Sequence, residues 1–152
     1  MSSQHPNLVW AILTAGAVCG VIDLACALIV FRARGVTPAR ALQGIASAAF
    51  GPAAFQRGRQ SATLGALFHF VVAFSAATVY CLAACKFAFL AKQPYLLGPI
   101  YGISVHLFMT FIVLPLSRLN RPFSASFFFV QLAIHVFAVG LPIALVAHAF
   151  LK

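Results

Sequence analysis

Four apolar stretches, each long enough to cross a lipid bilayer as a helix, occupy most of this sequence of 152 residues. A transmembrane helix needs about 20 apolar residues, because each residue adds only about 1.5 Å to its length. The sequence places these stretches at 8–31, 61–85, 95–117 and 123–151. We therefore predict an all-α integral membrane protein, a four-helix bundle in which residues 1–152 form a single membrane domain.

The composition excludes a soluble globular protein, because 63% of the residues are hydrophobic and only 7% are charged. The formal net charge of +9 is also found in nucleic-acid-binding proteins. Here, however, the basic residues lie between the apolar stretches, where they act as topology signals and as anchors for lipid headgroups. We expect the lipid bilayer as a partner and no nucleic acid.

The distribution of Lys and Arg predicts the orientation of the chain. Five lie between spans one and two and two between spans three and four, against two between spans two and three and one at the C-terminus. Basic loops remain in the cytoplasm. This distribution places both termini on the outer side of the membrane.

The connection between the first two spans contains a short helix, predicted over residues 38–50. Thr37 and Pro38 form a good N-cap and first turn, and Gly51 with Pro52 ends the helix. This spacing is typical of an amphipathic helix lying on the membrane surface, and a re-entrant hairpin is the alternative. The polar side of this interfacial helix consists of Arg40, Gln43 and Ser47.

Small residues mark the faces on which the spans are expected to pack. Gly16 and Gly20 form a GxxxG pair, which permits close approach of two helix backbones, and Asp23 follows on the same face. Asp23 is therefore expected to face the bundle and not the lipid. The other predicted packing glycines are Gly65, Gly98 and Gly102.

Asp23 is the only acidic residue of the chain, and an ionised carboxylate inside a membrane normally has a partner. Counted from the nearest arginine on the cytoplasmic side, Asp23 and one histidine from each other span lie within roughly 14 to 21 Å of that side. His69 is nearest to Asp23 in depth and is its predicted partner. The predicted buried polar layer consists of Asp23, His69, His106, Gln131 and His135.

Three functions are consistent with this layer. It can hold together a structural or accessory bundle, as a homo-oligomer or as a subunit of a larger complex, through interhelical hydrogen bonds. Alternatively, Asp23 and His69 can relay a proton in proton-coupled or small-ligand transport, since histidine titrates near neutral pH. The third possibility is haem b or a metal ion, bound by ligands from His69, His106 and His135.

Enzymatic activity is disfavoured, because there is no second carboxylate and no nucleophile visibly matched to a base. An Asp23–His69 dyad that acts on a lipid stays open. None of the four cysteines forms a CxxC pair, so the sequence indicates neither a redox motif nor a zinc ribbon.

Several stretches resemble small four-span bacterial inner-membrane proteins, the YagU-like proteins among them. They are GVID at 20–23, ALQGIASAAFG at 41–51, LGALFHF at 64–70, VLPLS at 113–117 and HVFAVGLPIAL at 135–145. The resemblance implies a multi-pass protein of the bacterial inner membrane with both termini in the periplasm, and it implies no activity. His106 departs from the residue expected at its position, which weighs against a three-histidine metal site.

Overall fold

The computed structural model describes residues 7–119 and 122–152, and within these ranges all regular structure is helical. Four helical stretches are long and apolar enough to cross a membrane, which confirms the predicted fold class. They are Leu8–Ala33, Gly58–Lys86, Pro94–Leu116 and Ala125–Leu151.

Two of the four spans change helix type along their length. The third continues from α-helix into a π-helical segment, in which the hydrogen bonds reach one residue further, and the fourth contains a second such segment. In chain order the elements are α1 (Leu8–Ala33), α2 (Pro38–Phe50), the 3-10 helix η1 (Gly51–Gln56), α3 (Gly58–Lys86), α4 (Ala88–Lys92), α5 (Pro94–Phe108), the π-helical η2 (Met109–Val113), α6 (Leu114–Leu116), α7 (Ala125–Ile134), the π-helical η3 (His135–Gly140) and α8 (Leu141–Leu151).

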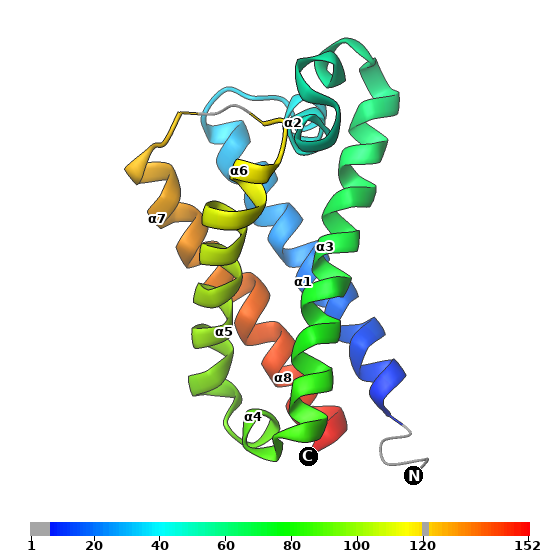
Figure 1. Ribbon diagram of the computed structural model, residues 1–152, viewed down its shortest axis with the longest axis vertical. Helices are drawn as coiled ribbons and strands as arrows, with labels where there is room; N and C mark the ends of the chain where they lie inside the picture. The colour runs from blue at the N-terminus through cyan, green and yellow to red at the C-terminus, as the bar shows by residue number, and fades with distance from the viewer. Residues whose placement is uncertain (1–6, 120–121) are drawn as a thin grey trace.

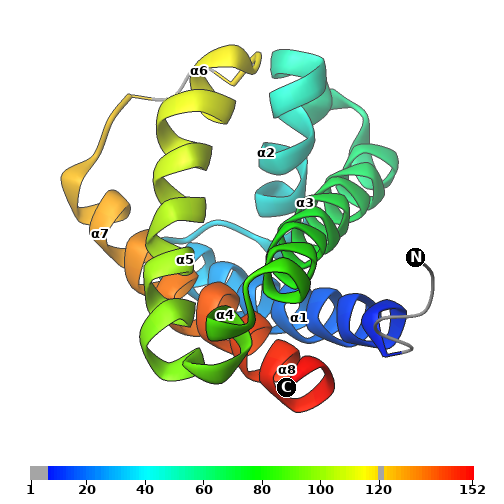
Figure 2. The same ribbon diagram turned by 60° about the horizontal axis from the view of Figure 1, so that its bottom comes forward.

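The centre of the bundle is the antiparallel pair of α1 and the fourth span (Figure 1). α3 packs against α1, and α5 packs against η3 and α8. α3 and α5 meet through Tyr80 and Tyr101, whose ring centres lie 4.9 Å apart. α2 and α6 both lie at the end of the bundle opposite the C-terminus (Figure 2). The Arg118 amide, two residues after α6, donates to the Ala48 carbonyl of α2 at 2.8 Å.

Close helix contacts occur at the glycines of the packing faces. A Cβ on Gly16 or Gly20 would collide with the ring of Phe74 or Phe70 of α3. Two other glycines contact backbone instead. Gly65 of α3 lies against the backbone of Leu42 in α2, and Gly102 of α5 against the backbone of His135 and Val136. Gly98 packs against α8 and Gly140.

The short helix between the first two spans has the predicted bounds, Pro38–Phe50, and the chain turns at Gly51 with a φ of 63°. Most of its predicted polar side does not face outward. Gln43 and Ser47 are buried. Gln43 Nε2 donates to the Gly58 carbonyl at 2.8 Å, and Ser47 Oγ donates to the Gly44 carbonyl at 2.6 Å. Only Arg40 of the predicted polar side is exposed. Two of the three residues predicted for the polar side are thus covered by the protein, and the position of this helix at the membrane surface stays a prediction.

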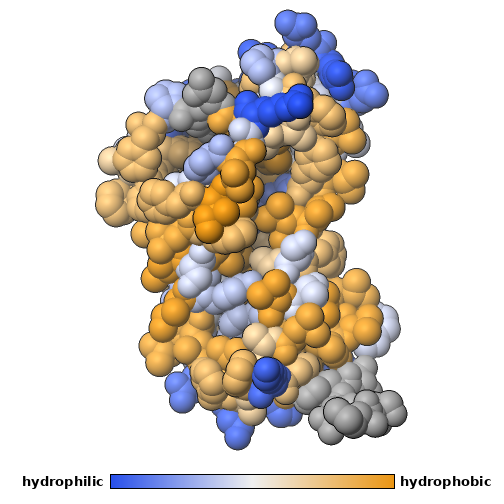
Figure 3. All heavy atoms as spheres, in the orientation of Figure 1, coloured by the Kyte–Doolittle hydropathy of each residue, from blue (hydrophilic) through white to orange (hydrophobic). Residues whose placement is uncertain are grey.

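The surface is an apolar belt with polar ends (Figure 3). Large apolar side chains are exposed along all four spans, for example Val21, Leu82, Phe111 and Phe137. Asn7 and Phe150 lie at the same end, since the Asn7 amide reaches the Phe150 carbonyl at 3.4 Å. The belt is the surface that a multi-pass membrane protein presents to lipid.

Candidate functional site

A contact between α1 and the fourth span shows which of their polar residues lie at the same depth. The rings of Phe31 and Phe127 lie 5.7 Å apart. Asp23 precedes Phe31 by eight residues and His135 follows Phe127 by eight, so in this antiparallel pair they lie at about the same level. The structure thus gathers the ionisable residues at one depth, where they form two pairs.

The first pair joins α1 to α3. His69 Nε2 lies 2.8 Å from the carbonyl oxygen of Gly20, and its Nδ1 lies 3.9 Å from Oδ2 of Asp23. Both side chains keep a small exposed fraction, 12% for His69 and 17% for Asp23. The ring of Phe70 stands edge-on to that of His69 at 5.4 Å. This is the pairing predicted from the depth of the two residues.

The hydrogen bond to Gly20 determines where the protons of His69 can be. A carbonyl only accepts, so Nε2 carries a proton, and in the neutral imidazole Nδ1 then presents a lone pair toward Asp23. A lone pair facing an ionised carboxylate is repulsive. A proton on Nδ1 or on the carboxyl group of Asp23 would remove this repulsion.

The second pair joins α5 to the fourth span. The ring centres of His106 and His135 lie 5.0 Å apart, and the ring of Phe128 lies 4.7 Å from that of His106. His135 Nδ1 donates to the Gln131 carbonyl at 2.8 Å, which leaves Nε2 with a lone pair. Gln131 thus takes part in this layer through its backbone carbonyl.

His106 is the most enclosed member of the layer, with 4% of its surface exposed. Within the described residues its Nε2 is the one buried side-chain nitrogen or oxygen without a hydrogen-bond partner. The two π-helical segments lie beside this pair, since η3 begins at His135 and η2 three residues after His106. Such segments are frequent at functional sites.

The three histidines considered as haem or metal ligands do not come together. His69 bonds to α1, whereas His106 and His135 contact each other. In the described part of the chain, no three side chains of His, Cys, Asp or Glu converge so that they could hold a metal ion. All four cysteines are free thiols.

Side chains that the sequence did not single out also tie the helices together. Tyr101 donates to the Ala76 carbonyl at 2.7 Å, Tyr80 to the Leu90 carbonyl at 3.0 Å, and His148 to the Ala91 carbonyl at 2.7 Å. Each polar side chain reaches a backbone carbonyl of another helix. A tyrosine within an apolar span is the sequence signal for such a bond, because its hydroxyl needs a partner when buried.

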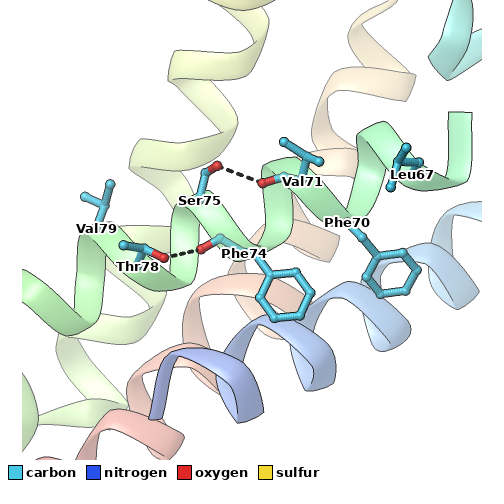
Figure 4. A pocket seen from close by; sticks show the side chains of 7 residues that line it. All are labelled: Leu67, Phe70, Val71, Phe74, Ser75, Thr78 and Val79. Carbon is cyan, nitrogen blue, oxygen red and sulfur yellow. Dashed lines mark hydrogen bonds between the residues drawn. The ribbon is translucent and has the colours of Figure 1, made fainter. Parts of the chain in front are cut away.

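A groove of about 580 Å³ runs along the outer side of α3 (Figure 4). The rings of Phe70 and Phe74 point from it toward α1. Ser75 and Thr78 donate their hydroxyls to the carbonyls of Val71 and Phe74, at 2.7 Å in both cases, so these hydroxyls already have partners within α3. The groove suits a lipid acyl chain and no polar ligand.

The fold and surface define a multi-pass helical membrane protein with a polar layer inside the bundle. The chain matches no protein-family model, no curated protein and no solved structure. The function is therefore argued from the polar layer.

Proposed function

We propose that the protein is a small membrane carrier in which Asp23 and His69 take up and release one proton, coupled to the passage of a small ligand. A single observation carries the proposal: the only side-chain carboxylate of the chain has His69 Nδ1 as its neighbour at 3.9 Å. Intramembrane carboxylates that pair with histidine are typical of proton relays in pumps and transporters.

The structural alternative accounts for His69 but leaves Asp23 unexplained. His69 already ties α3 to α1 through the Gly20 carbonyl, and that bond needs no carboxylate. Among the described residues, no donor lies within hydrogen-bond distance of the Asp23 carboxylate. A carboxyl group that contributes no hydrogen bond, and that is costly in a membrane when ionised, is better explained by function.

The partial exposure of the pair supports exchange of its proton. Contact with water eases the gain or loss of a proton, and Asp23 and His69 retain 17% and 12% exposure. Figure 3 shows a hollow between α5 and α3 in the half of the molecule nearer α2, on the side where these two helices diverge. The expected cargo is a ligand small enough to reach the pair between the helices.

Proton flux into liposomes containing a pH-sensitive dye tests the proposal. Asp23→Asn and His69→Gln should abolish flux that the wild type supports. His148→Gln is the matched control, because His148 also bonds to a backbone carbonyl of another helix but has no carboxylate beside it in the described structure. Equal flux in the wild type and Asp23→Asn would refute the proposal.

An accessory or homo-oligomeric role is the second candidate, favoured by the side-chain bonds to backbone carbonyls between helices. Under this role, Asp23→Asn and His69→Gln change assembly size or yield without a change in flux. Light scattering of the protein in detergent measures the assembly size. Unchanged size and yield in both variants would count against this role.

For location, we propose a bacterial inner membrane with both termini in the periplasm. The described arginines lie at the α2 end, while Lys86, Lys92 and Lys152 lie at the end that carries the C-terminus. Positive charge is retained in the cytoplasm. A C-terminal alkaline phosphatase fusion should be active and a green fluorescent protein fusion dark. The reverse result would overturn this orientation.

A further inference from the structure

The α2 end of the molecule carries a strong positive charge that no protein group neutralises. Six described arginines gather there, and the single acidic residue of the chain, Asp23, lies nine or more residues away inside the first span. They are Arg32, Arg34, Arg40, Arg57, Arg59 and Arg118. A positive surface of this kind requires anions from outside the chain.

Three of these arginines lie over aromatic rings. Arg34 lies 4.9 Å from the ring centre of Phe127 in the fourth span, and the other two lie over rings of α2 and η1. The guanidinium carbon of Arg40 lies 4.4 Å from the ring centre of Phe55, and that of Arg57 lies 5.2 Å from the ring centre of Phe50. Stacking occupies the flat face of a guanidinium and leaves the N–H groups at its edge free. In the described structure neither the Arg40 nor the Arg57 guanidinium donates to a protein acceptor.

The segment that carries both arginines is built rigidly. Gln43 donates from α2 to the carbonyl of Gly58, the residue after Arg57. Ser61 of α3 donates to the Ala54 carbonyl of η1 at 2.5 Å. Gln43 and Ser61 are both buried, so these bonds hold α2, η1 and the start of α3 as one unit. The unit fixes two forked donors, Arg40 and Arg57, at the membrane end of the bundle.

We propose that Arg40 and Arg57 form a binding site for the headgroup phosphate of an anionic phospholipid. Guanidinium edges match phosphate oxygens two at a time, which makes arginine well suited to this anion. Phe50 and Phe55, both partly buried, supply apolar surface beside the charges. The lipid is the favoured occupant, because Arg57 directly precedes α3, whose exposed apolar side chains, such as Leu67, offer a surface for its acyl chains. The site is independent of the proton-coupled function.

Native mass spectrometry of the full chain, released from nanodiscs of phosphatidylglycerol or phosphatidylcholine, tests the site. The wild type should retain phosphatidylglycerol selectively. Arg40→Gln/Arg57→Gln should weaken this retention roughly tenfold or more, since each basic residue at a membrane surface contributes about 1 kcal/mol. Arg32→Gln/Arg59→Gln is the matched control, because it removes the same charge at the same end from two exposed arginines.

The comparison with the control decides between a defined site and diffuse attraction. Equal losses in the two double variants would overturn the proposal, as would equal retention of both lipids by the wild type. Arg40→Lys/Arg57→Lys keeps the charge and removes the fork, so it should retain less phosphatidylglycerol than the wild type. Full retention by this variant would likewise contradict the site. Thermal unfolding in detergent verifies that each variant is folded.

Discussion

The backbone of Gly102 in α5 touches that of His135 at the residue where the fourth span becomes π-helical. A Cβ on Gly102 would collide with the carbonyl oxygen of His135, which cannot turn aside as a side chain can. This contact brings the helices of His106 and His135 together. The second polar pair therefore depends on the absence of a side chain at Gly102.

Gly102→Ala should lower the free energy of unfolding by about 1 to 3 kcal/mol, the usual cost of overpacking. Gly20→Ala should cost less, because the atoms it meets first belong to the Phe70 side chain. Unfolding in mixed micelles with increasing denaturing detergent measures both. The interpretation is contradicted if the two variants are equally stable.

His106→Phe should leave stability unchanged or raise it by up to about 1 kcal/mol, because it removes a buried nitrogen that has no partner. Phenylalanine also suits the contact with the Phe128 ring. His135→Phe, by contrast, loses the bond to the Gln131 carbonyl and should destabilise. A large loss in His106→Phe, measured by thermal unfolding, would show that this nitrogen binds something essential.

Tyr101→Phe should destabilise by about 0.6 kcal/mol, the average for an interhelical hydrogen bond in a membrane. Its hydroxyl bonds to the Ala76 carbonyl and connects α5 to α3. Tyr95→Phe is the control, since Tyr95 is 77% exposed. Crosslinking of cysteines introduced in α3 and α5 should also become slower only in Tyr101→Phe. Identical crosslinking rates would rule out this role.

Gln43→Ala tests the inward orientation of α2. The change leaves the Gly58 carbonyl without its donor, and a buried unsatisfied group costs about 1 to 3 kcal/mol. Gln60→Ala, at an exposed position of α3, should have little effect. If α2 lay with its polar side in water, the two variants would behave alike in thermal unfolding.

The length and spacing of the apolar stretches were sufficient to predict the architecture. Residues 38–50 form a helix as expected, because Thr37 and Gly51 mark its ends locally. The pairing of Asp23 with His69 also follows from sequence, since depth in a membrane can be counted at a constant rise per residue. The helix ends depend on neighbouring residues, and the depth depends only on the number of residues along each span.

Features that depend on lateral packing could not be predicted. The sequence places Gln43 and Ser47 on a polar side, and only the position of α3 shows that this side is covered. Likewise, His69 and His106 lie at similar depth, yet the helices that carry them contact different partners. Periodicity gives the direction of a side chain on its own helix and not the neighbour it meets.

The π-helical segments η2 and η3 change which sequence positions share a face of the third and fourth spans. One extra residue in a turn rotates everything beyond it by about 100° around the helix axis. The two halves of the fourth span, α7 and α8, therefore present sequence positions that a continuous α-helix would not align. Deleting one residue within η3 would restore ordinary phase and turn the half that carries Ala144 and Ala147 away from the bundle.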